Sequence, residues 1–251
     1  MVSLDRPLVV LAVALVAQWL AAYVGDVIRK RTRPLEQDER ADIDLVRAAS
    51  LTLLGLIIGF SFAMAVSRYD QRKNYEEAEA NAIGTEYLRA DLLPAAEAAK
   101  VRALLRKYLD RRVAFYVVRD SDQLAEINAE TQKLQAELWS TVVGAVTAQR
   151  TAIEALVVAG MNDVLNAQGY TQAAWWNRIP VAAWALMGLI AIACNLLFGY
   201  GERRSSALAL VLPIIVSISF FLIADIDSPR AGVIRVSPQN LLALSQTMPP
   251  Q

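Results

Sequence analysis

Apolar residues are concentrated in four uncharged stretches of the chain, residues 7–25, 48–67, 179–201 and 205–224. A helix needs about 20 apolar residues to cross a hydrocarbon core of about 30 Å. We therefore predict four transmembrane helices. The first stretch is long, follows Asp5 and precedes the basic residues 29–31. This favours a retained membrane helix over a cleaved signal peptide.

Residues 68–178 separate the second and third apolar stretches and carry charges of both signs. The spacing of apolar residues in this segment predicts helices. One helix should begin after Pro94, with one face formed by Val101, Leu104, Leu105, Tyr108 and Arg112. A longer helix should begin near Ser121 and Asp122, which are good N-caps. Steps of three and four residues continue along it through Leu134, Leu138, Val142, Ala145, Ala152 and Leu156.

The predicted fold is all-α: a polytopic, oligomeric membrane protein with four transmembrane helices arranged as two hairpins. Residues 1–67 form the first hairpin, 68–178 a helical extramembrane linker, 179–224 the second hairpin and 225–251 a C-terminal tail. A charged connection joins the first two spans. The short turn Glu202, Arg203 and Arg204 joins the last two.

Composition narrows the function. Net charge is zero, with 25 basic and 25 acidic residues, so no bulk attraction to nucleic acid is expected. The chain has no histidine, the usual general base and the commonest metal ligand. No ionisable residue lies near the middle of a span, where intramembrane catalysis would need one. We predict no enzymatic activity and no cofactor.

The second span carries a candidate pore lining. Thr52, Leu56 and Phe60 are four residues apart and form one stripe of a helix. Around an axis, several copies would form stacked rings, and such apolar constrictions gate channels by dewetting. The alternative is that the stripe contacts lipid or the bundle core. Gly55 and Gly59 form a G-x-x-x-G step, which favours close helix packing in lipid.

Charges become frequent where the second span leaves the membrane. Arg68, Arg72 and Lys73 are candidates for the wall of an ion-attracting vestibule, whereas a solvated helix surface is the alternative for most charges in residues 68–91. Arg72 with Glu76, and Lys73 with Glu77, are spaced to pair across helical turns.

Two further motifs flank the second hairpin. Trp175 and Trp176, followed by Arg178, predict an interfacial anchor with the indole rings at headgroup depth, with an aromatic binding cage as the alternative. Asp225 and Asp227 end the fourth span. Two carboxylates are too few by themselves for Ca²⁺, which takes six to eight oxygen ligands, so we assign no metal site and expect an ordinary membrane exit. The alternative is that Asp225 and Asp227, together with backbone carbonyls, contribute to a Ca²⁺ site.

Two segments resemble the bestrophin anion channels. Gly59-Phe60, followed by Ser67-Arg68-Tyr69, resembles the end of the bestrophin pore helix, and Thr52, Leu56 and Phe60 match its three neck positions. Residues 225–232 are similar to the acidic-Pro-Phe-Gly segment, without the phenylalanine and with one extra residue. Over most of its length, including residues 79–94, the chain looks more like the bacterial bestrophin-like membrane proteins.

The resemblance implies a homopentamer in a lipid bilayer that passes inorganic anions along the second span. It also implies a bacterial inner (plasma) membrane, with the termini and the linker in the cytoplasm. The number of basic residues on the two sides of the membrane does not decide the orientation. The cluster after the first span favours the opposite orientation, with the first connection in the cytoplasm. It comprises Arg29, Lys30, Arg31 and Arg33. The alternative function is a non-conducting scaffold or sensor whose linker binds a partner.

Overall fold

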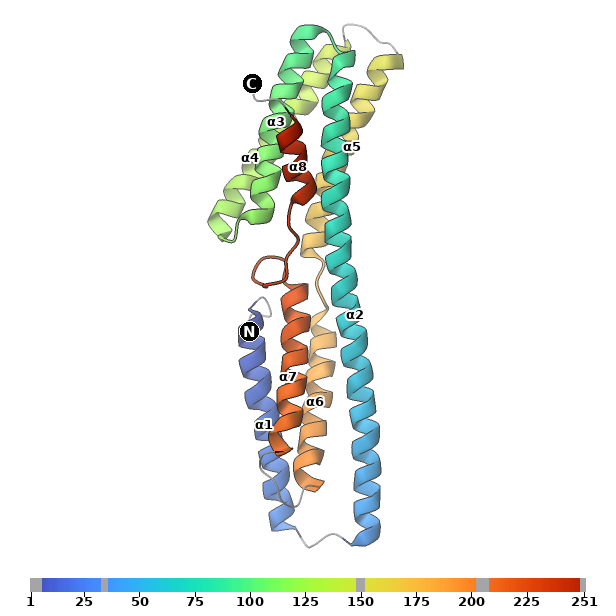
Figure 1. Cartoon of the computed structure of the whole chain (residues 1–251), viewed down its shortest axis with the longest axis vertical. Helices are drawn as coiled ribbons and strands as arrows, with labels where there is room; N and C mark the ends of the chain where they lie inside the picture. The colour runs from blue at the N-terminus through green and yellow to red at the C-terminus, as the bar shows by residue number, and fades with distance from the viewer. Residues whose placement is uncertain (1–5, 33–35, 148–151, 202–207, 249–251) are drawn as a thin grey trace. The chain divides into compact units, whose positions relative to one another are not determined.

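The structure is a computed structural model that describes residues 6–32, 36–147, 152–201 and 208–248, and every regular element within these ranges is a helix. The predicted all-α fold is confirmed. The predicted turn at Glu202, Arg203 and Arg204, and Arg33, lie outside the described residues. Figure 1 shows the elements, which are α1 (Pro7–Arg31), α2 (Gln37–Arg89), η1 (Ala90–Leu92), α3 (Ala95–Val117), α4 (Ser121–Thr147), α5 (Ala152–Trp176), α6 (Val181–Gly201), α7 (Leu208–Asp227) and α8 (Gln239–Thr247).

Helix α2 contains the second predicted span and extends well beyond it at both ends, over 53 residues. Its sequence has no proline, and Asp38 and Glu39 in its first turn complement the helix dipole. The helix gives way to η1, and Leu93 is extended, as expected for the residue before a proline. The charged connection predicted between the first two spans is therefore largely helical.

The chain divides into two compact units. The first, which we call the membrane unit, comprises Met1–Tyr69 and Arg178–Arg235; the second, the helical unit, comprises Asp70–Asn177 and Val236–Gln251. The predicted C-terminal tail, residues 225–251, is thus shared between the two units. The four predicted spans coincide with helices that are long and apolar enough to cross a membrane.

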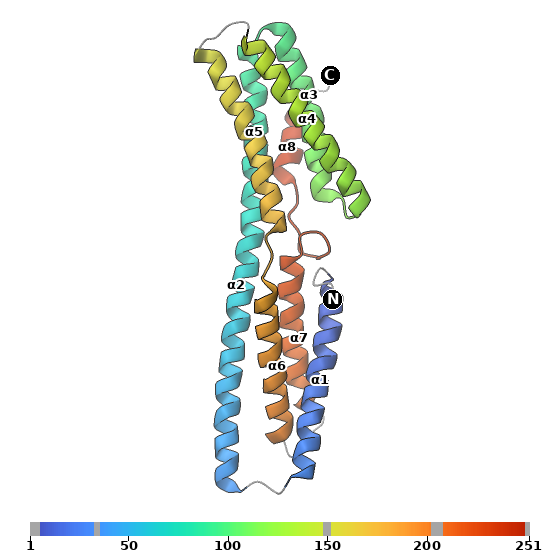
Figure 2. The ribbon, with the colours of Figure 1, turned by 180° about the vertical axis from the view of Figure 1, so that it is seen from behind.

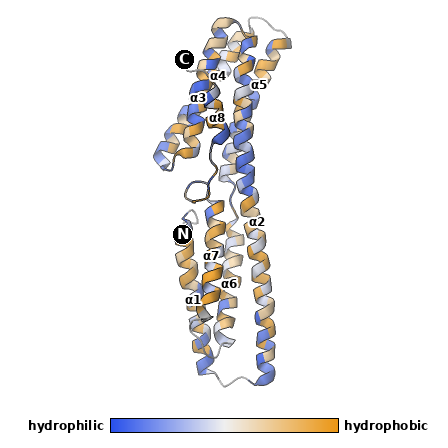
Figure 3. Cartoon of the chain, viewed as in Figure 1, coloured by the Kyte–Doolittle hydropathy of each residue, from blue (hydrophilic) through white to orange (hydrophobic). Residues whose placement is uncertain are grey.

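In the membrane unit, α1 packs along α6 and α7, as both views of the ribbon show (Figure 2). All three helices are apolar over most of their length (Figure 3). A Cβ atom on Gly25 of α1 would overlap the backbone oxygen of Leu196, and one on Gly199 of α6 would overlap that of Ala22. The two backbones therefore meet where only glycine fits, the geometry that small residues permit in lipid.

A buried polar cluster joins the same three helices. The Gln18 side-chain amide donates to the Ser217 hydroxyl at 3.2 Å, and the Asn195 amide donates to the Gln18 oxygen at 3.0 Å. All three side chains are buried. Hydrogen bonds between spans stabilise membrane helix packing because lipid offers no alternative partner. The cluster links α1, α6 and α7.

In the helical unit, α3 lies against α4 and α8, and α4 lies against α5. The predicted face of α3 is confirmed, because Val101, Leu104, Leu105, Tyr108 and Arg112 are all buried. The predicted starts of α3 after Pro94 and of α4 at Ser121 are also confirmed. The predicted cap is wrong by one residue: the Asp120 carboxylate accepts the backbone N–H groups of Asp122 and Gln123 at 3.1 and 2.9 Å, and Ser121 is the first residue of the helix.

The prediction of one helix from Ser121 through Leu156 is wrong. Two helices, α4 and α5, occupy this stretch and lie antiparallel, since Gln135 contacts Gln168 across them. Leu138 and Val142 of the predicted stripe are buried, whereas Leu156 is exposed. The apolar spacing runs on from one helix to the next, and no glycine or proline in residues 145–155 marks the boundary.

We predict that Gly199→Ala lowers the free energy of unfolding by about 1–3 kcal/mol, because the added methyl group overpacks the α1–α6 crossing. Thermal unfolding of the purified protein in detergent measures this change. Gly188→Ala on the same helix is the matched control, since a Cβ there meets nothing within 4 Å. Equal stability of the two variants would contradict the close crossing.

Candidate functional site

The stripe of Thr52, Leu56 and Phe60 lies on the surface of the membrane unit. Leu56 is 52% exposed and Phe60 is 63% exposed, and Thr52 is also exposed. Leu54 and Ala65 are buried on the other side of α2, since successive residues of a helix are about 100° apart. The described part of the chain therefore leaves this stripe of α2 open to lipid, to solvent or to other copies.

Thr52, the one polar side chain of the stripe, has its hydroxyl donor occupied within its own helix, so the stripe offers no free side-chain donor. The Thr52 hydroxyl donates to the Ala48 backbone oxygen at 2.9 Å, which satisfies its donor within the same helix. Gly55 and Gly59 are exposed beside it, and a Cβ on either would meet nothing within 4 Å. A helix that packs closely on these glycines is therefore not found among the described residues of this chain.

The two aspartates in the last turn of α7 bind backbone and basic groups of the membrane unit. Asp225 accepts hydrogen bonds from the backbone N–H groups of Val233 and Ile234, both at 2.8 Å. A Cβ on Gly232 would overlap the Asp225 backbone oxygen, so a side chain at position 232 would prevent the loop from closing. Asp225 thus fixes a tight loop after the fourth span.

Asp227 organises the start of the third span. It accepts the backbone N–H of Ile179 at 3.1 Å and lies 3.7 Å from the Arg68 guanidinium, while its backbone oxygen accepts from Arg178 at 3.0 Å. The carboxylate oxygens of both aspartates therefore have partners within the protein. No cluster of three or more metal-binding side chains occurs in the part of the chain that is described.

The sequence makes Arg72 a candidate for a vestibule wall. The structure contradicts this, because Arg72 is buried and only 1% exposed. Its guanidinium donates to the backbone oxygens of Ala174 and Asn177 at 3.2 and 3.3 Å. These carbonyls belong to the last turn of α5 and the residue after it, where helix carbonyls lack partners and cations are favoured. Lys73, the next residue, is exposed.

The two tryptophans have different environments. Trp175 is 4% exposed and packs edge-on against Phe115 at 4.9 Å and Tyr116 at 5.4 Å between ring centroids. It belongs to the core of the helical unit and is not an interfacial anchor. Trp176 is 74% exposed, so only this indole is available for a membrane interface.

Several charged residues of α2 form a buried stripe within the helical unit. The prediction of a solvated helix surface for most charges of residues 68–91 is wrong for these residues. The members of the stripe are Arg72, Glu76, Glu79 and Glu86, at helical spacing and almost fully buried. Glu76 accepts the Leu241 backbone N–H at 2.9 Å and the Asn240 amide at 2.6 Å, at the start of α8. The carboxylate therefore caps the N-terminus of α8.

Glu79 joins three helices. It forms a fully buried ion pair with Arg112 of α3 and accepts the Thr171 hydroxyl of α5 at 3.1 Å. The Arg112 guanidinium also lies 4.4 Å from the Phe115 ring centroid, a cation–π contact. Burial, together with the Glu79 charge, raises the pKa of Tyr108 and of Tyr116 above the ordinary tyrosine range. The cluster is enclosed and its two charges are paired, which suits a structural junction, although Arg112 Nη1 has no hydrogen-bond partner among the described residues.

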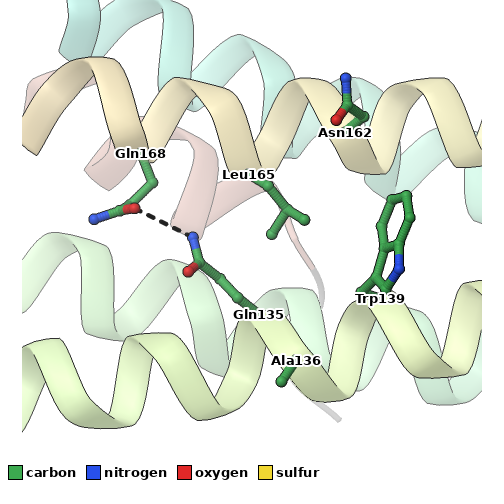
Figure 4. Close-up of a pocket in the computed structure, with 6 residues that line it drawn as sticks. All are labelled: Gln135, Ala136, Trp139, Asn162, Leu165 and Gln168. Atoms are coloured by element: carbon green, nitrogen blue, oxygen red, sulfur yellow. Dashed lines mark hydrogen bonds between the residues drawn. The ribbon is translucent and has the colours of Figure 1, made fainter.

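A shallow groove of about 400 Å³ opens between α4 and α5 (Figure 4). Amide side chains, one indole and two aliphatic groups line it: Gln135, Ala136, Trp139, Asn162, Leu165 and Gln168. The Gln135 amide donates to the Gln168 oxygen across the groove at 3.4 Å. None of these six side chains is ionisable, so the groove offers hydrogen bonding and apolar contact without acid–base chemistry.

The sequence profile of the Bestrophin-like domain matches residues 8–241. The chain belongs to the bestrophin-like family. A comparison of the sequence with curated proteins finds no match.

Solved structures support the fold. A crystal structure of a bacterial bestrophin homolog from Klebsiella pneumoniae is 14% identical, with a TM-score of 0.63, covering 96% of this chain and 98% of that one. A variant of that homolog with tryptophan replaced by alanine is 12% identical, with a TM-score of 0.60 and coverages of 94% and 97%. A membrane protein with a glycine-to-alanine substitution is 14% identical, with a TM-score of 0.62 and coverages of 95% and 99%.

The chain is an integral membrane protein, because it belongs to the bestrophin-like family and has four helices apolar enough to cross a membrane. The same chain plan is shared with these structures at low sequence identity. The likeness therefore lies in the packing of helices rather than in particular side chains.

We predict that Glu79→Gln destabilises the protein by about 3–5 kcal/mol, because it leaves the Arg112 cation buried without its counter-charge. Thermal or denaturant unfolding, followed by circular dichroism, measures the change. Glu77→Gln is the matched control, since Glu77 is exposed on the same helix. A Glu79→Gln variant as stable as this control would show that the pair contributes nothing.

Proposed function

We propose that this chain is the subunit of a homo-oligomeric ion channel in which α2 lines the pore. One observation carries the proposal: a chain of the bestrophin-like family leaves the stripe of Thr52, Leu56 and Phe60 uncovered on α2. In an oligomer with α2 around the axis, each position would form a ring. Leu56 and Phe60 would then form an apolar neck, which gates by dewetting.

The neck favours inorganic anions in this proposal. Aromatic rings carry partial positive charge on their edges, so a ring of Phe60 side chains would present this charge to the pore. The Thr52 hydroxyl donates within its own helix and leaves oxygen lone pairs at the end of the neck. We propose a pentamer, following the bestrophins.

The glycines of α2 supply the contact between copies. Gly55 and Gly59 are open in the single chain and lie beside the proposed pore stripe, so a neighbouring helix can approach them closely. A contact there would hold each α2 next to the following one while leaving Phe60 directed to the axis.

Beyond the neck, the exposed Lys73 remains a candidate for a vestibule wall. Arg68 has a carboxylate partner in Asp227, which offsets its charge, and the buried Arg72 takes no part. We place the termini and the linker, residues 68–178, in the cytoplasm of a bacterium and the hairpins, residues 1–67 and 179–224, in its inner membrane.

A second function is favoured by the groove between α4 and α5. Its uncharged amides and the exposed Trp139 side chain suit a protein or small polar partner. A non-conducting scaffold or sensor would use this surface and leave the α2 stripe in contact with lipid or other helices.

For the channel, we predict ion-selective current from purified protein in planar bilayers, with anions more permeant than cations. Phe60→Ala and Leu56→Ala should each change single-channel conductance or selectivity several-fold, since both widen the neck. Leu189→Ala is the matched control, because Leu189 is a leucine of α6 that is 65% exposed. Silence for both anions and cations from folded oligomers would instead support the scaffold.

For the assembly, we predict that Gly59→Leu lowers the oligomeric state in detergent, because a leucine blocks close approach of a second α2. Size-exclusion chromatography with light scattering measures the mass. Gly188→Leu is the control, since Gly188 borders an apolar cavity of about 240 Å³ that accepts a side chain. Oligomers of equal mass in both variants would contradict a glycine contact between copies.

A further inference from the structure

Glu86 differs from the other glutamates of the buried stripe. It lies on α2 in the helical unit, about five helical turns beyond Ser67 and the apolar span. Its side chain is fully buried. Glu76 and Glu79 accept hydrogen bonds, but neither carboxyl oxygen of Glu86 has a hydrogen-bond partner among the described residues.

Gly160 of helix α5 lies directly against this carboxyl. A Cβ on Gly160 would overlap Glu86 Oε2 and the Arg89 guanidinium. The absence of a side chain at position 160 therefore allows α5 to lie directly against the Glu86 carboxyl.

The charged groups near Glu86 do not satisfy it. Arg89 of α2 favours the ionised form and Asp163 of α5 opposes it, yet neither donates a hydrogen bond to Glu86 in the described structure. In η1, which also contacts α5, Asp91 is paired with Arg102. Burial is the largest influence and raises the pKa of Glu86 to about 8.

An ionised carboxylate with no donor is costly to bury, whereas the neutral acid is not. We infer that Glu86 is a proton-binding site: the protonated carboxyl lets α5 pack on α2 at Gly160, and loss of the proton releases this part of α5. The ionised group is stable only when water reaches it, and α5 must move away for water to enter.

The release is local. The C-terminal half of α5 stays attached to α2, because Thr171 donates to Glu79 and the carbonyls of Ala174 and Asn177 accept from Arg72. The half of α5 around Gly160 lies instead against the Glu86 carboxyl, which has no hydrogen-bond partner among the described residues, so it moves first. This switch lies within the helical unit and does not depend on ion conduction.

The sign follows from linkage. The packed form has a Glu86 pKa of about 8, above the ordinary value of 4.5 that a hydrated carboxyl takes. Packing is therefore fully favoured below pH 4.5 and weakens as the pH rises toward 8. Between these values, each pH unit changes the ratio of released to packed α5 by up to about tenfold.

Release can be measured with a thiol probe in the full-length protein. Val157 is fully buried on α5, one turn before Gly160, and Cys194 is the only native cysteine. In a Cys194→Ala, Val157→Cys background, we measure alkylation by a water-soluble maleimide from pH 6 to pH 9, with and without Glu86→Gln. The ratio of the two rates cancels the titration of the thiol itself.

The rate ratio should rise with pH by up to about tenfold per unit and level off above pH 8. Infrared spectroscopy should show a protonated carboxylic acid that titrates near pH 8. This band should be absent in Glu86→Gln and unchanged in Glu77→Gln. Asp163→Asn, which keeps Glu86, should lower the midpoint.

Two results would overturn the inference. One is a Glu86 midpoint near 4.5, with or without Asp163→Asn. The other is a rise in alkylation with pH that is the same in the Glu86→Gln background. Asp163→Asn keeps the test decisive if Glu86→Gln fails to fold, because it leaves the buried carboxyl in place.

Discussion

The buried ion pair between Glu79 and Arg112 is the interaction on which the helical unit depends. It joins α2 to α3, and Thr171 adds α5 to the same carboxylate. Breaking a buried ion pair leaves an uncompensated buried charge, so these three helices must meet where Glu79 and Arg112 can pair. Arg72 and Glu76 extend the principle along α2, each satisfying the end of another helix. A single helix thereby positions most of the unit.

The membrane unit follows a different physical rule. In lipid, apolar side chains gain nothing by leaving their surroundings, so packing depends on close backbone approach and on hydrogen bonds. Gly25 and Gly199 supply the first, and the Gln18, Asn195 and Ser217 cluster supplies the second. The Gly55 and Gly59 step has no such partner within the chain. Small residues spaced four apart therefore pack against another helix of the same chain in α1, whereas the step in α2 is open.

Several elements were predictable because their signals are local. Helix α3 begins directly after Pro94 and α4 directly after Asp120, since proline and a capping aspartate act through the neighbouring backbone. The boundary between α4 and α5 has no such signal, and the apolar spacing continues across it. The Ala21-x-x-x-Gly25 step was available in the sequence as a sign of the α1–α6 crossing, but its partner Gly199 lies far along the chain.

The sequence by itself determined the helical class, the four spans and the alignment of Thr52, Leu56 and Phe60 on one stripe of α2, because each depends on residue spacing along one helix. Tertiary structure alone decided which charges are solvated. Lys73 is exposed and Arg72 is buried, although the two are adjacent and both cationic. Trp175 and Trp176 are likewise adjacent, yet Trp175 is buried and Trp176 is exposed. Burial depends on which distant helix covers a side chain, and residues on the two sides of one helix carry no sign of that in their own sequence.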